Sequence, residues 1–217
     1  MLFRSLEVIV VDGGSTDDTR KLAVGFPQVR LLLGPKGRGL QMNVGALNSR
    51  GEFLLFLHAD TVLTDQHLYT LRRLSVKPGF AAGAFELCLT PPRPALRFIA
   101  WGANWRCRLF GLPYGDQALV LKREVFFALG GYSHRRPEDL DLVIRLKRLA
   151  SLNLLGPPLP SSARRWLKKG YFATTLNNWL FLSLHLLERL FTSRWPAQGD
   201  LWGAASQLPP QFTPGHT

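Results

Sequence analysis

Two apolar stretches of the sequence each stop abruptly on a carboxylate. The run "LEVIVV" leads into Asp12, and the run "GEFLLFL" leads through His58 and Ala59 into Asp60. A carboxylate directly after a buried strand must be solvated, hydrogen-bonded or bound to a cation, because burying it unpaired is too costly. In an open parallel sheet, ligands collect beyond the carboxyl ends of the strands. We therefore expect Asp12 and Asp60 to lie at one ligand-binding edge.

Each of these side chains has two interpretations. Asp12 can accept hydrogen bonds from the amides of its own turn, "DGGS", or from a base or ribose donor. Asp60 can be a ligand for Mg²⁺ or Mn²⁺, which hold diphosphates through carboxylate oxygens, or a carboxylate without a metal. His58 shares a face with Asp60 if the strand persists, and an imidazole suits Mn²⁺ better than Mg²⁺. A purely structural role for His58 is the alternative.

Three further clusters have residue types suited to binding charged groups. The loop "GPKGRG" places Lys36 and Arg38 among glycines, which lets phosphates approach the backbone, although it is neither a Walker loop nor a Rossmann fingerprint. The segment "PEDLDLVIRLKR" begins a helix with acids that either do chemistry or complement the helix dipole, the latter contributing about 0.3–1 kcal/mol per charge. The segment "SSARRWLKKG" is either a solvated basic face or an anion site.

The bulk composition limits the protein class. The chain has 217 residues and 46% hydrophobic residues, so it can bury a sizeable core. Its net charge of +12 implies an anionic partner, and charge alone admits nucleic acid, a phosphorylated metabolite or an acidic membrane surface. Cys88 and Cys107 are too few and too isolated for a disulfide framework or a zinc site, which indicates a reducing compartment.

Apolar periodicity and turn residues alternate strands with helices, which predicts an α/β fold with a parallel sheet covered by helices. Strands are expected over residues 6–11, 29–33, 53–58, 80–89 and 118–122. Helices are expected from a Ser15 or Thr16 cap to Gly25, and over residues 40–48, 99–110, 123–129 and 137–149. The segment "GPPLPSSAR" reads as a turn-rich connection.

The C-terminal part of the sequence is amphipathic and basic. Residues 171–191 carry an apolar face at helical spacing but contain too many polar residues for a membrane span. That face either packs on the domain or a partner, or lies in a membrane interface. The basic residues just upstream are Arg164, Arg165, Lys168 and Lys169. The expected organisation is a core over residues 1–160, a basic segment with the amphipathic helix over 161–195, and a disordered tail over 196–217.

Taken in order, these motifs resemble one known family. The segments "EVIVVDGGSTDDT", "GRGLQMNVGA", "LLFLHADT", "YGDQALVLKREVFFALGGY", "EDLDLVIRLKR" and "SARRW" follow the order of the family 2 glycosyltransferases with the GT-A fold. The resemblance covers roughly residues 6–190 and is greatest to the bacterial radical-SAM/selenodomain-associated transferases. It implies a mostly parallel α/β sheet with flanking helices, a nucleotide-diphosphate sugar donor and a divalent cation, Mg²⁺ or Mn²⁺.

The resemblance also implies roles for individual residues. Asp12 would contact the nucleotide base, and Arg38 would lie near the nucleotide. Asp60 would be the retained carboxylate of the metal-binding Asp-x-Asp motif, with His58 in place of its first member. Asp139 would be the catalytic base of an inverting transfer to an acceptor hydroxyl.

The remaining motif residues would bind the donor and the acceptor. Arg165 and Trp166 match the Gln-x-x-Arg-Trp motif near the diphosphate, with Ser162 where glutamine is usual. Asp116 and Glu138 would lie in the acceptor region. No nucleic-acid partner and a cytoplasmic location are expected. The net charge of +12 and the basic, amphipathic C-terminal stretch favour the inner face of the membrane, where a lipid-linked molecule is a candidate for the unidentified acceptor.

The beginning of the chain departs from the family pattern. The family normally opens with a strand, a Pro-x-x-Asn-Glu type turn and a helix, whereas this sequence starts at the tail of that helix. A first strand and helix are therefore expected to be missing, which would expose ladder groups and part of the nucleotide pocket. Two alternatives stay open beside a transferase. One is a catalytically inactive GT-A-like binding module, and the other is a sugar nucleotidyltransferase.

Overall fold

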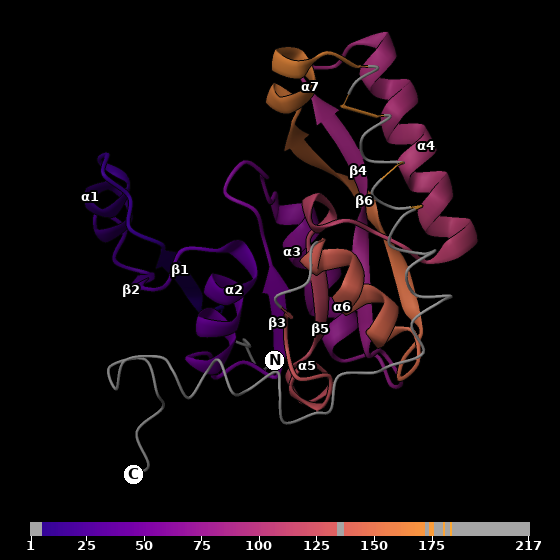
Figure 1. Ribbon diagram of the computed structural model, residues 1–217. Coiled ribbons are helices and arrows are strands. Elements are labelled where there is room, and N and C mark those ends of the chain that lie inside the picture. Colours follow the sequence, from indigo (N-terminus) through magenta and orange to yellow (C-terminus); the bar gives the residue numbers. More distant parts are fainter. Residues whose placement is uncertain (1–5, 134–136, 172–173, 176–179, 181–182, 184–217) are drawn as a thin grey trace. The chain divides into compact units, whose positions relative to one another are not determined.

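The structure is a computed structural model that describes residues 6–133, 137–171, 174–175, 180 and 183 (Figure 1). The described residues fall into two compact units. The first lies within Met1–Leu54 and Leu121–Leu142, and the second within Leu55–Val120 and Val143–Trp195.

The first unit is built on a pair of parallel strands. Strand β1 (Val8–Asp12) pairs with β2 (Val29–Leu33), with Val8 opposite Val29 and Asp12 opposite Leu33. Parallel neighbours need a crossover connection, and helix α1 (Thr19–Val24) forms part of it. Helix α2 (Arg38–Leu47) packs on β1 and buries Val44 and Ala46.

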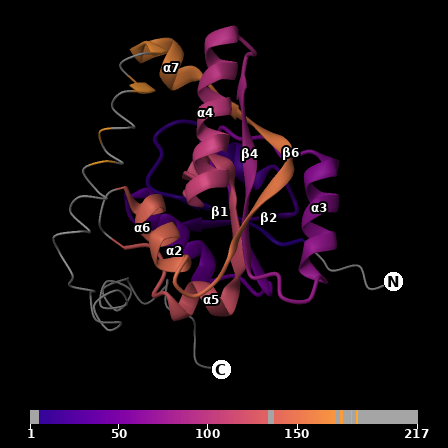
Figure 2. The same cartoon turned by 90° about the vertical axis from the view of Figure 1, so that its right-hand side faces the viewer.

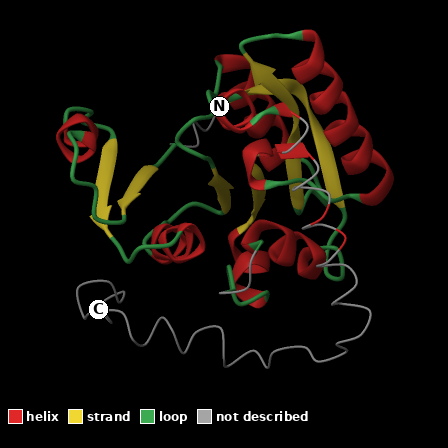
Figure 3. Cartoon of the chain, turned by 45° about the horizontal axis from the view of Figure 1, so that its top comes forward, coloured by secondary structure: helices red, strands yellow, loops and turns green. Residues whose placement is uncertain are grey.

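The longer sheet has four strands in the order β3-β5-β4-β6, namely β3 (Phe53–Phe56), β5 (Leu119–Lys122), β4 (Ala82–Thr90) and β6 (Leu152–Ser162). Strand β6 runs parallel to β4 (Figure 3). The interior strand β4 is buried along most of its length, as a strand covered on both faces should be. Helix α5 (Arg123–Ala128) follows β5 directly, and α6 (Glu138–Leu146) comes after it in the chain.

Two long helices flank the second unit's sheet. Helix α3 (Asp65–Ser75) packs beside β6, and α4 (Pro94–Phe110) packs beside β4, so that they lie on either side of this strand pair (Figure 2). Thr64 and His67 form a capping box at the start of α3, which satisfies amides that the first turn leaves unpaired. The short helix α7 (Arg164–Lys169) follows β6.

The α/β class with a mostly parallel sheet and flanking helices is confirmed, but several elements differ from expectation. The "GPPLPSSAR" segment is not a connection, because it forms much of β6. Its prolines are tolerated since β6 is the edge strand and its pairing with β4 shifts register between Phe85 and Leu87, which leaves Gly156–Pro158 out of the ladder. Helix α3 was not expected at all. Helix α4 begins at Pro94 instead of residue 99, since proline suits the first helical turn.

Among the described residues, the structure has no helix that is both long enough and apolar enough to cross a membrane. Most of the amphipathic segment expected over residues 171–191, and all of the tail expected over 196–217, lie outside the described residues.

Candidate functional site

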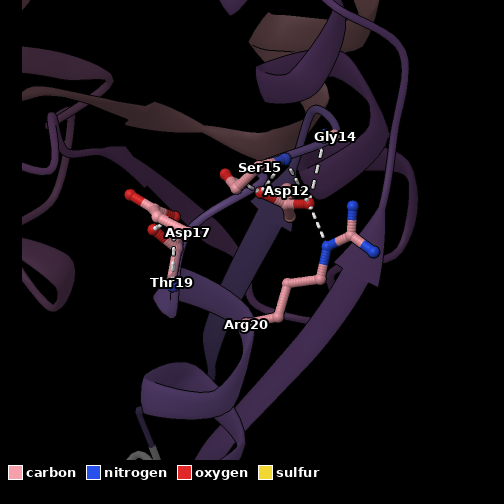
Figure 4. Close-up of polar contacts among 6 residues, drawn as sticks. All are labelled: Asp12, Gly14, Ser15, Asp17, Thr19 and Arg20. Atoms are coloured by element: carbon pink, nitrogen blue, oxygen red, sulfur yellow. Dashed lines mark hydrogen bonds and ion pairs between the residues drawn. The ribbon is translucent and has the colours of Figure 1, made fainter.

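Asp12 is held by its own turn at the end of β1 (Figure 4). Its carboxylate accepts hydrogen bonds from the amides of Gly14 and Ser15, each at 3.1 Å, and from the Ser15 hydroxyl. Arg20, from α1, donates its Nε to the same carboxylate at 2.7 Å. The Ser15 hydroxyl foremost, then the Arg20 guanidinium and the two amides, outweighs burial and lowers the pKa of Asp12 to about 2.

Asp12 therefore accepts hydrogen bonds from the amides of its own turn, which confirms one of the two interpretations of the sequence. It also pairs with Arg20, which the sequence did not indicate. The expected Ser15 or Thr16 cap on the first helix is wrong. Helix α1 begins at Thr19 without a side-chain cap, and the Ser15 hydroxyl bonds to Asp12 instead. Asp17 accepts from the Thr19 amide and hydroxyl at 3.1 and 2.5 Å (Figure 4). A contact between Asp12 and a nucleotide base stays a prediction.

Arg38 joins the start of α2 to the start of α6. Its Nε lies 3.0 Å from Glu138 Oε1, and its Nη2 lies 2.8 Å from Asp139 Oδ2. The Arg38 side chain is 46% exposed, whereas those of Glu138 and Asp139 are 15% and 9% exposed. The structure thus brings the arginine of the "GPKGRG" loop together with Glu138 and Asp139 of the "PEDLDLVIRLKR" segment, although the sequence separates Arg38 from Glu138 by 100 residues.

The backbone geometry around this ion-pair cluster depends on Gly39. A Cβ at Gly39 would lie 3.3 Å from Tyr132 Cβ, which is tighter than ordinary packing, and 3.5 Å from Glu138 Cγ, which is an ordinary contact. The absence of a side chain at Gly39 therefore lets the first turn of α2 approach the loop at Tyr132.

Asn43 clamps the loop that leads toward the acids. Its Oδ1 accepts from the Tyr132 amide at 2.8 Å, and its Nδ2 donates to the Tyr132 carbonyl at 2.9 Å. Gly131, at φ +72°, precedes Tyr132, and a Cβ there would lie 2.7 Å from Asn43 Oδ1. Glycine is needed at Gly131 on both counts, since the backbone is left-handed and the amide side chain fills the space.

Asp141 differs from its two neighbours in the acidic cluster. It is 2% exposed and accepts a hydrogen bond from the Ser133 hydroxyl at 2.8 Å. Glu138 and Asp139, by contrast, face the half-exposed guanidinium of Arg38. Asp141 therefore helps to fix the "GGYS" loop on α6, whereas Glu138 and Asp139 are the acids that pair with Arg38.

In the second unit, the segment after β3 turns and runs beside the end of β6. The Thr61 amide donates to the His58 carbonyl at 3.1 Å, and the Ser162 amide donates to the Asp60 carbonyl at 3.1 Å. Thr61 and Ser161 form an antiparallel bridge. Strand β3 ends at Phe56, so the strand expected over residues 53–58 is too long, and the strand alternation expected for His58 and Asp60 does not apply.

The same contacts place the "HADT" turn against the start of the "SSARRW" segment. The Asp60 side chain is exposed, and so is Arg165 on α7. Trp166 is 7% exposed and packs in a cluster with Leu87 and Leu96 of β4 and α4. Its indole thus anchors α7, and its contact with a donor stays a prediction, as does that of Arg165.

The "GDQ" segment is held in place by Gln117, a residue to which the sequence analysis assigned no role. Gln117 is fully buried, and its Nε2 donates to the Phe85 carbonyl at 2.9 Å. Its Oε1 accepts from the Tyr114 amide at 3.2 Å and from the Cys107 thiol at 3.1 Å. Burial raises the pKa of both Tyr114 and Cys107. These contacts hold the short 3₁₀ helix η1 (Gly115–Gln117), which carries Asp116, the residue expected in the acceptor region.

The described residues contain no group of three or more His, Cys, Asp or Glu side chains placed to hold a metal ion. The Asp60 carboxylate is exposed, and its turn is fixed by backbone hydrogen bonds. A role for Asp60 or His58 as a cation ligand stays a prediction.

Comparisons with known proteins agree on a family. The model of the family described as "Glycosyl transferase family 2" matches residues 3–140. A dolichyl-phosphate beta-glucosyltransferase of Trichomonas vaginalis is 43% identical over 60 residues, which are 25% of this chain and 18% of that relative.

Two solved structures have a similar fold. A mannosyltransferase from Pyrobaculum calidifontis in complex with GDP-Man and Mn²⁺ has a TM-score of 0.63 and 18% identity, covering 94% of this chain and 66% of that one. S. aureus TarS in complex with UDP-GlcNAc has a TM-score of 0.55 and 16% identity, covering 72% of this chain and 49% of that one. The chain therefore spans less than two thirds of the length of each of these proteins.

Proposed function

This chain belongs to glycosyl transferase family 2, and from that premise we propose that it transfers a sugar from a nucleotide-diphosphate donor to an acceptor hydroxyl. The observation that carries the proposal is the cluster of Arg38, Glu138 and Asp139 at the meeting of α2 and α6. Two carboxylates beside one half-exposed guanidinium provide a proton acceptor and a cation for phosphate within a few ångströms.

Asp139 is the proposed base. Its carboxylate takes the proton of the acceptor hydroxyl while the hydroxyl oxygen forms a bond to the anomeric carbon of the sugar. The bond from that carbon to the diphosphate oxygen breaks, and its electron pair leaves with the nucleoside diphosphate. Because attack and departure occur on opposite faces of the carbon, the configuration inverts.

The resemblance to the family supplies donor-binding roles for individual residues. Asp12 and its turn would receive the base, Arg38 would lie near the nucleotide phosphates, and Arg165 would lie near the diphosphate. Asp60, with a contribution from His58, would hold a divalent cation that neutralises the departing diphosphate. Two of the structurally similar proteins are complexes with nucleotide sugars, one of them with Mn²⁺ as well, which supports this donor class.

The acceptor proposed here is lipid-linked, and transfer would then take place at the inner face of a membrane. The support is the net charge of +12, which exceeds what one diphosphate requires, and the short match to an enzyme named for dolichyl phosphate. The acceptor-region roles that the resemblance implies for Asp116 and for Glu138 stay predictions for each residue separately.

Asp139→Asn tests the proposed base. The amide keeps the size of the side chain but cannot accept the proton, so release of nucleoside diphosphate from UDP-glucose or GDP-mannose, supplied with a membrane-lipid extract, should fall at least about a hundredfold. Calorimetric titration with UDP and Mn²⁺ should give unchanged binding. Asp18→Asn is the matched control, since the Asp18 side chain is 75% exposed and pairs only with its neighbour Lys21 among the ion pairs described.

Two outcomes of this experiment and one separate assay distinguish the competing functions. Turnover that survives Asp139→Asn would refute its role as the base. Donor binding without turnover in either protein would favour an inactive binding module. In a separate assay, pyrophosphate release from sugar 1-phosphate and a nucleoside triphosphate would identify a nucleotidyltransferase. The pairing of Arg38 in the glycine-rich loop with Glu138 and Asp139 does not favour that class.

A further inference from the structure

Helix α4 exposes a stripe of large apolar side chains to solvent. Phe98 is 71% exposed, Trp101 56%, Trp105 42% and Leu109 65%. Spacings of three, four and four residues place these four side chains, the α4 stripe, on one face of the helix. The opposite face is buried against the sheet through residues that include Leu96, Ala100 and Cys107.

The aromatic rings of the α4 stripe contact one another. Phe98 stacks on Trp101 with ring centroids 5.6 Å apart, and Trp101 meets Trp105 edge-on at 6.1 Å. The stripe is therefore a continuous aromatic surface and not a scatter of isolated exposed residues. A helix that is apolar on both its inner and its outer face is normally covered on both, so the α4 stripe marks an interaction surface.

The charges around the stripe indicate the chemistry of what covers it. Helix α4 has no acidic residue in its 17 positions. Arg97 and Arg108 are exposed on one flank of the stripe, and Arg93 is exposed just before the helix. Arg108 pairs with Glu86 of β4, and Arg93 donates a hydrogen bond to the Tyr171 hydroxyl at 3.3 Å. Both Arg93 and Arg97 remain exposed and can face an anionic partner.

The adjoining helix α7 adds positive charge at the same end of α4. Trp166 of α7 packs in one cluster with Leu96 and Ala100 of α4, which ties the two helices together. Arg164 and Lys168 of α7 are exposed beside it. A second copy of this chain would bring like charges together at this surface, and each copy carries a net charge of +12.

We propose that the α4 stripe lies in the headgroup region of an anionic lipid bilayer, with α4 parallel to the membrane plane. Tryptophan and phenylalanine on one face of a helix, with arginine beside them, are the residues that bind helices to this region, where the indole ring is half solvated and half in hydrocarbon. The proposal does not depend on the transferase reaction, and it concerns residues of α4, whereas the sequence suggested a membrane contact for residues 171–191.

Sedimentation of the full chain with vesicles tests the proposal. Vesicles of phosphatidylcholine alone are compared with vesicles that contain about one third phosphatidylglycerol, at about 0.05 and 0.5 M salt. The protein should sediment with the anionic vesicles at low salt and much less at high salt. Trp101→Ser/Trp105→Ser should lower the vesicle partition coefficient at least about tenfold. Arg97→Gln should lower it about fivefold on anionic vesicles alone.

The matched control is Tyr69→Ser on α3, which removes an aromatic side chain that is 62% exposed, from a different helix. It should sediment like the unaltered chain. The proposal fails if the chain stays in the supernatant, or if the double tryptophan variant sediments as well as the control. It also fails if the only effect of the double variant is to dissociate an oligomer in sedimentation velocity, because a second copy of the chain would then cover the α4 stripe. It fails likewise if the only effect is a lower melting temperature, because another part of the same chain would then cover the stripe.

Discussion

Asp12 illustrates how one carboxylate can organise a turn through several hydrogen bonds. The hydrogen bonds from Ser15 and Arg20 favour its charged form, and they depend on a backbone turn that the glycines of "DGGS" permit. The turn-amide interpretation could be derived from the sequence, because acid–glycine–glycine–serine is local turn chemistry. The partner Arg20 could not, since its side chain reaches back from a helix whose starting residue was placed wrongly.

The pKa of Asp12 predicts how acid affects the fold. Because the folded-state pKa of Asp12 is about 2, below its usual value of 3.8, the Asp12 contacts stabilise the folded state above the unfolded-state pKa, and this stabilisation is lost as the pH falls through the folded-state value. Ser15→Ala removes the largest contribution, so its acid-unfolding midpoint should shift to higher pH. Circular dichroism from neutral pH down to about pH 2 measures the shift. Thr16→Ala, at an exposed position of the same turn, should unfold like the unaltered chain, and a shift of equal size there would contradict this account.

At the residue scale, side-chain contacts between residues far apart in the sequence could not be predicted. Asp139 was identified through the resemblance, yet nothing in the residue pattern connects it with Arg38. The same applies to Gln117, which is the buried last residue of η1 and donates a hydrogen bond to the Phe85 carbonyl of β4, 32 residues away. A glutamine beside an aspartate in a loop gives no local signal of burial, so its role becomes visible only when the strands are in place.

At the scale of elements, the sequence predicted those whose signals are local. Strand β2 begins and ends as expected, and α2, β5 and α5 lie within two residues of expectation, because apolar periodicity and terminal glycines define them. Strand β6 was missed because three of its residues are prolines, which normally argue against a strand. Only the sheet order, which places β6 at an edge, explains why they are tolerated.

The junction between α2 and the loop before α6 should be sensitive to Asn43. Asn43→Ala removes both hydrogen bonds to the Tyr132 backbone and leaves a part-buried amide and carbonyl to find other partners, at a cost of about 2–3 kcal/mol in the free energy of unfolding. Asn48→Ala, which removes one local bond to Val44 at the end of the same helix, should cost less than about 1 kcal/mol. Urea unfolding followed by circular dichroism measures both free energies of unfolding. Equal decreases in the two variants would show that the Asn43 hydrogen bonds to Tyr132 contribute no more than the single local bond of Asn48.

At the scale of the whole molecule, composition predicted an anionic partner and a reducing environment, and the order of six motifs predicted the family, which the comparisons confirm. Composition could not predict which surface of the protein would bind an anionic partner. A net charge of +12 is a sum over the chain, whereas the Arg38 cluster and the arginines beside the α4 stripe are separate local features. The positions of these arginines depend on how the helices and strands pack, which the net charge does not describe.

Ligand binding by the whole chain can be measured through its stability. A nucleotide that binds only the folded protein adds RT ln(1 + [L]/Kd) to the free energy of unfolding, about 2.7 kcal/mol at one hundred times Kd, so UDP with Mn²⁺ should raise the melting temperature by several degrees. If Asp60 holds the cation, Asp60→Asn should abolish the increment that Mn²⁺ adds to UDP while preserving the melting temperature of the free protein, because the Asp60 side chain is exposed. Glu124→Gln, with a side chain that is 74% exposed, should retain the full increment. An increment that persists in Asp60→Asn would place the cation elsewhere, and an increment lost in both variants would show that general negative charge, and not Asp60, attracts the metal.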